Sequence, residues 1–157
     1  MISHIDHIVL TVRDIDKSVE FFASILGMTP VTYANGRKAV TFGNQKINFN
    51  LLGQEVRNHA LEGSGDVCLV TSVSLQQMQD HLAALQIDII EGPITKNGAQ
   101  GDIESIYIND LDYNLIEISA YPEQENSAQT EEKVAKTPAK KTRSRTSKSN
   151  TTKAKST

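Results

Sequence analysis

His4 and His7 have the H-x-x-H spacing of a metal-binding pair, but that spacing brings two imidazoles together only on a helix. The stretch 5–12 instead has the pattern of a strand, in which neighbouring side chains point to opposite faces. The even-numbered positions from Ile8 onward are apolar and form the face that packs on the next element. We therefore discard His4 as a ligand. His7, on the other face, is either a group with a chemical role or an ordinary polar residue.

Polar side chains from three further predicted strands point the same way as His7. Asn48 and Asn50 alternate with apolar residues in the stretch 46–51, and Glu117 alternates with apolar residues in the stretch 114–120. Asp66 opens the strand that begins the second half of the chain, where it is the counterpart of His7. A carboxylate on an inward face carries a desolvation cost that a cation relieves. The sequence therefore predicts a polar site on this surface.

The helix after the first strand is predicted from its caps and its apolar stripe. Either Asp14 or Asp16 can accept hydrogen bonds from the free amides at its start, and Gly27 ends it. An apolar stripe at helical spacing is expected to pack on the first strand. That stripe contains Val19, Phe22, Ile25 and Leu26.

The pattern of strand, helix and further strands occurs twice. In the first half, Asn35-Gly36 and Gly43-Asn44 separate short strands after the helix. In the second half, Ser74 and Gln77 form a capping box before another apolar stripe. The predicted strands are 5–12, 29–33, 38–42, 46–51, 66–71, 87–90, 104–109 and 114–120. A glycine-bearing loop is predicted at 92–101, and Gly98 and Gly101 make it either a plain surface loop or a mobile flap.

The two ends of the chain differ in charge. Residues 1–132 carry seven basic and nineteen acidic side chains, a net charge of −12, whereas residues 133–157 carry nine basic and no acidic ones. Residues 1–121 have the apolar patterning of a folded domain. The stretch 122–157 is rich in Lys, Ser and Thr and is predicted to be a disordered tail. Its positive charge predicts weak binding to polyanions, without sequence-specific recognition.

The composition also indicates the cellular compartment of the protein. Cys68 is the only cysteine, which rules out an intrachain disulfide and favours a reducing compartment. No apolar run reaches the roughly 20 residues that a membrane helix needs, and no secretory leader is visible. We expect a soluble, cytoplasmic protein that does not bind membranes. Cys68 is expected to be a buried, inert thiol, and His59 and His81 to be solvated.

Two motifs carry a family resemblance. The sequence HIVLTVRD at 7–14, followed by SVEFF and Leu26-Gly27, is similar to the opening strand and helix of one known family. The sequence DLDYNLIE at 110–117 is similar to the closing D-P-D-G-N-x-I-E signature of the same family. The chain thus resembles the vicinal oxygen chelate superfamily over residues 3–121. That superfamily includes glyoxalase I, extradiol dioxygenases, fosfomycin-resistance proteins and bleomycin-binding proteins. Shorter stretches resemble most the glyoxalase domain-containing protein 5 subgroup; they lie at 46–48, 66–69, 91–93 and 114–119.

The resemblance implies an α+β fold of paired βαβββ modules, in which a cup-shaped mixed sheet surrounds a divalent metal. The domain would span residues 1–121, with modules at 5–51 and 66–120, followed by the tail at 122–157. The members of the superfamily commonly pair modules within or between chains, which implies a homodimer here.

The resemblance also implies roles for individual residues. The implied metal ligands are His7, Asp66 and Glu117. Asp66 and Glu117 are in addition the candidate catalytic carboxylates, because Asn48 occupies the place of a metal-bound glutamate of the glyoxalases and an amide cannot accept a proton. The implied substrate-binding residues are Asn48, Asn50 and Tyr107. Aspartate in place of a second histidine favours Mn²⁺ or Mg²⁺ over Zn²⁺, Ni²⁺ or Fe²⁺.

The implied function is that of a metal-dependent lyase, isomerase or dioxygenase. Its substrate would be a small molecule that chelates the metal through two oxygens, and the metal would act as a Lewis acid. The alternative is a metal-free protein that sequesters a small ligand, as the bleomycin-resistance members do.

Overall fold

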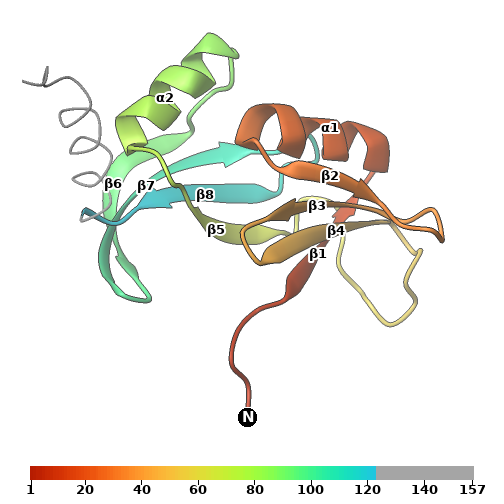
Figure 1. Ribbon diagram of the computed structural model, residues 1–157. Helices are drawn as coiled ribbons and strands as arrows, with labels where there is room; N and C mark the ends of the chain where they lie inside the picture. The colour runs from red at the N-terminus through yellow and green to blue at the C-terminus, as the bar shows by residue number, and fades with distance from the viewer. Residues whose placement is uncertain (123–157) are drawn as a thin grey trace, which may run out of the picture.

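The computed structural model describes residues 1–122 and arranges them as two consecutive modules, each with one helix against a four-stranded sheet (Figure 1). The first module contains β1 (His7–Val12), α1 (Ile15–Leu26), β2 (Thr29–Thr32), β3 (Lys38–Phe42) and β4 (Gln45–Leu51). The second contains β5 (Asp66–Val70), α2 (Leu75–Ala84), β6 (Glu91–Gly98), β7 (Gly101–Asn109) and β8 (Leu115–Ala120). The predicted pair of βαβββ modules is confirmed. Except for Pro122, the predicted tail at 122–157 lies outside the described residues.

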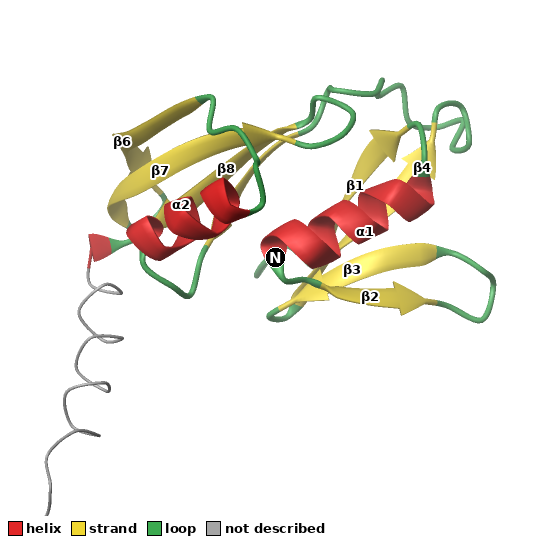
Figure 2. Cartoon of the chain, turned by 90° about the horizontal axis from the view of Figure 1, so that it is seen from above, coloured by secondary structure: helices red, strands yellow, loops and turns green. Residues whose placement is uncertain are grey.

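The two sheets have the same topology. Their strand orders are β1-β4-β3-β2 and β5-β8-β7-β6, and in each the first strand pairs in parallel with the last. The remaining pairs are antiparallel, so both sheets are mixed. Both helices lie on the same side of the sheets (Figures 1 and 2). Each sheet therefore keeps one face turned away from its helix, which we call its open face.

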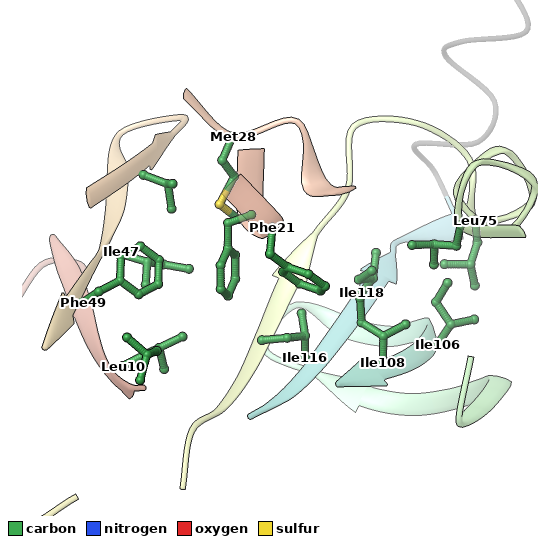
Figure 3. Packing of buried hydrophobic residues seen from close by; sticks show 14 of the residues in the cluster. Leu10, Phe21, Met28, Ile47, Phe49, Leu75, Ile106, Ile108, Ile116 and Ile118 are labelled. Carbon is green, nitrogen blue, oxygen red and sulfur yellow. The ribbon is translucent and has the colours of Figure 1, made fainter. Parts of the chain in front are cut away.

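Alternation along the strands decides which side chains reach the core. Leu10 and Val12 of β1 and Phe49 of β4 are buried on the helix-covered face, as predicted. Phe21 of α1 is also buried, although it lies beside the predicted stripe. Figure 3 shows it between the apolar side chains of the first sheet and those of β8, so that both modules share one cluster. Burial of such a side chain contributes about 1.5–3 kcal/mol.

The start of α1 resolves the open question about its cap. Asp14 is the N-cap, and its Oδ1 accepts hydrogen bonds from the amides of Asp16 and Lys17, each at 3.1 Å. The helix begins at Ile15, so that Phe22 points into the core.

The prediction for residues 87–101 is wrong. The strand runs over Glu91–Gly98, not over 87–90, and it pairs with β7 as a hairpin in place of the predicted loop or flap. In the sequence Gly92 indicates the start of a loop, but in the structure it lies inside β6, where two strands approach each other closely. Its φ is +107°, and a Cβ there would lie 2.5 Å from the Ser105 carbonyl oxygen. Gly98 and Gly101 pair with each other at the end of the hairpin.

Polar contacts join the first module to the β7–β8 turn. Asp112, whose side chain is 3% exposed, accepts hydrogen bonds from Arg13 Nε at 2.6 Å and from the Arg13 amide at 3.2 Å. Arg13 Nη2 also donates to the Leu111 carbonyl at 2.6 Å. Nearby, the amide of Gly65 donates to Asn114 Oδ1 at 2.8 Å. These contacts fix where β1 ends relative to β8. Separately, no helix among residues 1–122 is long and apolar enough to cross a membrane.

We expect Gly65→Ala to destabilise the fold by about 2 kcal/mol, since overpacking of a filled core has that scale. A Cβ at Gly65 would lie 2.7 Å from both Asn114 Oδ1 and Leu10 Cδ2, where the two modules meet. Urea unfolding followed by circular dichroism measures the loss. The comparison is Gly43→Ala, where φ is +48° and no atom lies within 4 Å, so only backbone strain of about 1 kcal/mol applies. Equal losses in the two variants would contradict close packing at Gly65.

Candidate functional site

The predicted residues of the first module lie on its open face. His7 pairs in register with Lys46, Val9 with Asn48, and Thr11 with Asn50. The residues between them in β1 and β4 enter the core, so these six share the opposite face. The predicted orientation of His7, Asn48 and Asn50 is thereby confirmed.

His7 is held by the residue before it. Its Nδ1 lies 2.6 Å from Asp6 Oδ1, and because a carboxylate only accepts, Nδ1 carries the proton. The hydrogen bond to His7 lowers the pKa of Asp6 from its ordinary value. Nε2 has no hydrogen bond within the described chain, and the side chain is 42% exposed. Histidines that bind a metal through one ring nitrogen commonly donate the other N–H to a carboxylate, and His7 makes such a bond to Asp6. His4 lies before the strand, where Ser3 Oγ is 2.8 Å from its Nδ1.

The two asparagines differ in environment. Asn50 is 6% exposed, and its Oδ1 accepts a hydrogen bond from Arg37 Nη2 at 3.1 Å. It therefore holds an arginine against the open face, a role that the sequence did not suggest. Asn48 is half-buried. The prediction that both bind substrate stays a prediction.

In the second module, Glu117 lies between Cys68 and Tyr107 in register. Its Oε1 accepts a hydrogen bond from Ser105 Oγ at 2.6 Å. Loss of solvation and a side-chain hydrogen bond with the Glu117 carboxylate raise the pKa of Tyr107 to about 12, so the phenol keeps its proton at neutral pH. Asp66 is exposed at the first position of β5.

Cys68 is exposed, so the prediction that it is buried is wrong. It lies on β5, the edge strand of its sheet, where its neighbour in β8 covers only one side. Its Sγ lies 3.3 Å from Ser119 Oγ. Partial desolvation raises the pKa of the Cys68 thiol and the hydrogen bond with Ser119 lowers it, but the Glu117 and Asp66 carboxylates raise it further, so that the thiol stays protonated at neutral pH. The expectation of a poorly reactive thiol therefore agrees with its surroundings.

The single chain does not bring the predicted ligands together. His7 belongs to the sheet of β1, whereas Asp66 and Glu117 belong to the sheet of β5 and β8. Within residues 1–122 no group of three or more His, Cys, Asp or Glu side chains has the geometry to hold a metal ion. The residues of the predicted site are thus divided between the two modules.

Sequence reasoning gave the two buried serines of this face no role at Glu117. Ser105 and Ser119 are fully buried, and both lie within hydrogen-bond distance of Glu117 Oε1. The alternation of β8 already placed Ser119 on the face of Glu117. No pattern indicated that Ser105, twelve residues earlier, bonds to the same oxygen.

His81 is not merely solvated as predicted. Its Nε2 lies 2.9 Å from the carbonyl oxygen of Ile25, so α2 contacts the last turn of α1. His59 is exposed in the segment between the modules, as expected.

A cavity of about 510 Å³ lies where α1 begins and β4 ends, with Arg37 among its lining residues. Phe49 forms part of its wall, together with Arg13, Asp16 and Lys38. Lys38 pairs with Asp16, and Arg13 pairs with Asp112, so two of its cations already have carboxylate partners. We therefore place the candidate site on the open faces and not in this cavity.

Known proteins share this sequence and this fold. A family model described as the Glyoxalase/Bleomycin resistance protein/Dioxygenase superfamily matches residues 4–118. The glyoxalase domain-containing protein RDO1 of Mycosarcoma maydis is 45% identical over 120 residues, which cover 74% of this chain and 68% of that protein. The virulence protein STM3117 of Salmonella typhimurium is 44% identical over 124 residues, which cover 77% of this chain and 86% of that protein.

Solved structures agree with these matches. The crystal structure of STM3117 superposes with a TM-score of 0.73, covering 77% of this chain and 98% of that chain. A lactoylglutathione lyase from Agrobacterium tumefaciens superposes with a TM-score of 0.62 at 20% identity, covering 76% of this chain and 95% of that chain. The second likeness shows the fold alone.

Proposed function

Because this chain belongs to the glyoxalase/bleomycin resistance protein/dioxygenase superfamily, we propose that it is a divalent-metal-dependent enzyme acting on a small molecule that offers two oxygens to the metal. Members of the superfamily commonly use divalent metals, bind small molecules and form dimers. One observation carries the proposal. His7 Nδ1 is fixed by Asp6 while its Nε2 has no hydrogen bond within the described chain, and Glu117 Oε1 is fixed by Ser105 Oγ.

The donor set fits a hard divalent cation. His7 Nε2 would supply one nitrogen, and Asp66 and Glu117 would supply carboxylate oxygens. Two carboxylates with a single imidazole favour Mn²⁺ or Mg²⁺. The Asp6 carboxylate would keep His7 in the tautomer that presents Nε2, and Ser105 would leave Oε2 of Glu117 for the ligand.

A cation bound there would supply Lewis-acid polarisation of the substrate oxygens. Asp66 or Glu117 would accept the proton that leaves the substrate, since the Asn48 amide has no basic atom at neutral pH. Asn48 would orient the substrate through its amide. Tyr107, which stays protonated because of its raised pKa, would donate a hydrogen bond to a substrate oxygen.

The site requires both half-sites, and a dimer supplies them. In our proposal the open face with His7 meets the open face with Asp66 and Glu117 of a second copy. The separation of these residues between two sheets of one chain supports this arrangement. A two-fold axis would then create two equivalent sites. Light scattering of the full chain at tens of micromolar is expected to give the mass of a dimer.

The experiment that tests metal binding is a thermal shift. Mn²⁺ at about 100 times its Kd is expected to add about 2.7 kcal/mol of stability and to raise the Tm of the wild-type chain. His7→Ala and Glu117→Ala are each expected to remove that rise, and Asp66→Ala to reduce it. The matched controls are His59→Ala and Glu62→Ala, which change an exposed and a half-buried residue between the modules.

Two results would contradict the proposal. A rise that persists in His7→Ala and Glu117→Ala would show that Mn²⁺ binds elsewhere. A wild-type chain that does not respond to Mn²⁺, Mg²⁺ or Zn²⁺ would instead favour the metal-free, ligand-sequestering function.

A further inference from the structure

A chain of hydrogen bonds leads from Cys68 to Glu117 beneath the open face of the second sheet. Cys68 Sγ lies 3.3 Å from Ser119 Oγ, Ser119 Oγ lies 2.8 Å from Ser105 Oγ, and Ser105 Oγ lies 2.6 Å from Glu117 Oε1. Both serines are 0% exposed. A buried hydroxyl without a partner is costly, so each of these bonds constrains the next.

Each hydroxyl has only one proton to donate, and this fixes the direction of the hydrogen bonds between Cys68 and Glu117. The shortest bond commits the single Ser105 hydroxyl proton to Glu117, because a carboxylate only accepts. Ser119 therefore donates to Ser105, and its more distant contact with Glu117 Oε1, at 3.4 Å, is secondary. The Cys68 thiol then donates to Ser119. Every donor thus points toward Glu117 Oε1.

We propose that Ser105 and Ser119 are positioning residues that hold the Glu117 carboxylate in one orientation and leave its Oε2 to face the ligand. Ser105 acts directly, and Ser119 acts through Ser105. The inference rests on the proposed role of Glu117 as a ligand-binding carboxylate.

The other half of the repeat supports this assignment. Asn48 occupies in β4 the place that Glu117 occupies in β8, and Asn50 corresponds to Ser119. Asn50 bonds to Arg37 and not to Asn48, and Arg37, just before β3, takes the place of Ser105 when the register of β3 with β4 is continued. The pair of buried hydroxyls thus occurs in the half that presents a carboxylate, whereas the half without one has an arginine and an amide in those places.

The first measurement uses the metal-free full chain. NMR relaxation of the Glu117 methylene groups is expected to give a high order parameter in the wild type, a clear loss in Ser105→Ala and a smaller loss in Ser119→Ala. Ser105→Thr restores the hydroxyl and is expected to restore the order. The control is Ser24→Ala, which removes an exposed helical hydroxyl bonded to the Glu20 carbonyl. Unchanged order of Glu117 in Ser105→Ala overturns the inference, whether or not the protein binds a metal.

The second measurement is the Mn²⁺ affinity of the same variants by electron paramagnetic resonance. Ser105→Ala is expected to raise the Kd by about 10-fold or more, the usual effect of losing a group that orients a ligand, and Ser105→Thr to reverse most of it. A Kd within about twofold of the wild type in Ser105→Ala would overturn the positioning role. A wild type that binds no Mn²⁺ contradicts the proposed function instead, and the NMR experiment still decides whether the serines order Glu117.

Discussion

Mixing His7→Ala chains with Glu117→Ala chains is expected to restore Mn²⁺ binding that neither variant has alone. In a mixed dimer, the intact His7 of one chain meets the intact Glu117 of the other, and the second site lacks both. If subunits exchange at random, half of the dimers are mixed and each has one working site, so about a quarter of the wild-type sites return. Electron paramagnetic resonance of bound Mn²⁺ counts them.

The control mixture contains Glu117→Ala chains and chains with both substitutions, in which no combination has both ligands. It is expected to bind no Mn²⁺. Differently tagged chains and light scattering establish that mixed dimers have formed. If mixed dimers form and Mn²⁺ binding does not return, the site does not lie between two chains. The two modules of one chain must then close on each other to make it.

Asp112→Ala is expected to lower the free energy of unfolding by about 2 kcal/mol, because it removes a buried carboxylate that holds the largely exposed Arg13 through charge-assisted hydrogen bonds. The Asp112 carboxylate accepts both the guanidinium and the backbone amide of Arg13, from a position 99 residues away in the chain. The ion pair with Asp112 raises the pKa of Arg13 from an already high value, so the arginine is charged at every accessible pH. Urea unfolding at pH 7 measures the loss.

Asp112→Asn keeps an acceptor oxygen and is expected to lose less stability than Asp112→Ala. The contrast is Glu55→Ala, which breaks the ion pair with Arg57 in the segment between the modules. The pKa of Glu55 is lowered to about 2, chiefly by its hydrogen bond to Arg57, yet the Arg57 side chain is exposed and that of Glu55 is partly exposed. Exposed pairs contribute little, so Glu55→Ala is expected to leave the unfolding curve almost unchanged. A similar loss of unfolding free energy in Glu55→Ala and Asp112→Ala would show that burial of the Asp112 carboxylate does not strengthen its ion pair.

Local patterns in the sequence determined the modules and the faces of their strands. The period of two in β1, β4 and β8 placed His7, Asn48 and Glu117 opposite the helices, because alternation depends only on neighbouring residues. The capping box at Ser74 is likewise local, and the structure contains it. The resemblance at 110–117 identified the family but did not reveal what each residue of that motif does.

Only the tertiary structure decided the contacts between distant segments. It gave Asp112 a role in joining the modules, made Gly92 part of a strand, and brought Ser105 to Glu117. It also separated His7 from Glu117 into two sheets, which is why we look for the complete site between two chains. These outcomes depend on pairing and packing between segments far apart in the chain. A pattern that repeats every two or every 3.6 residues contains no information about such pairing.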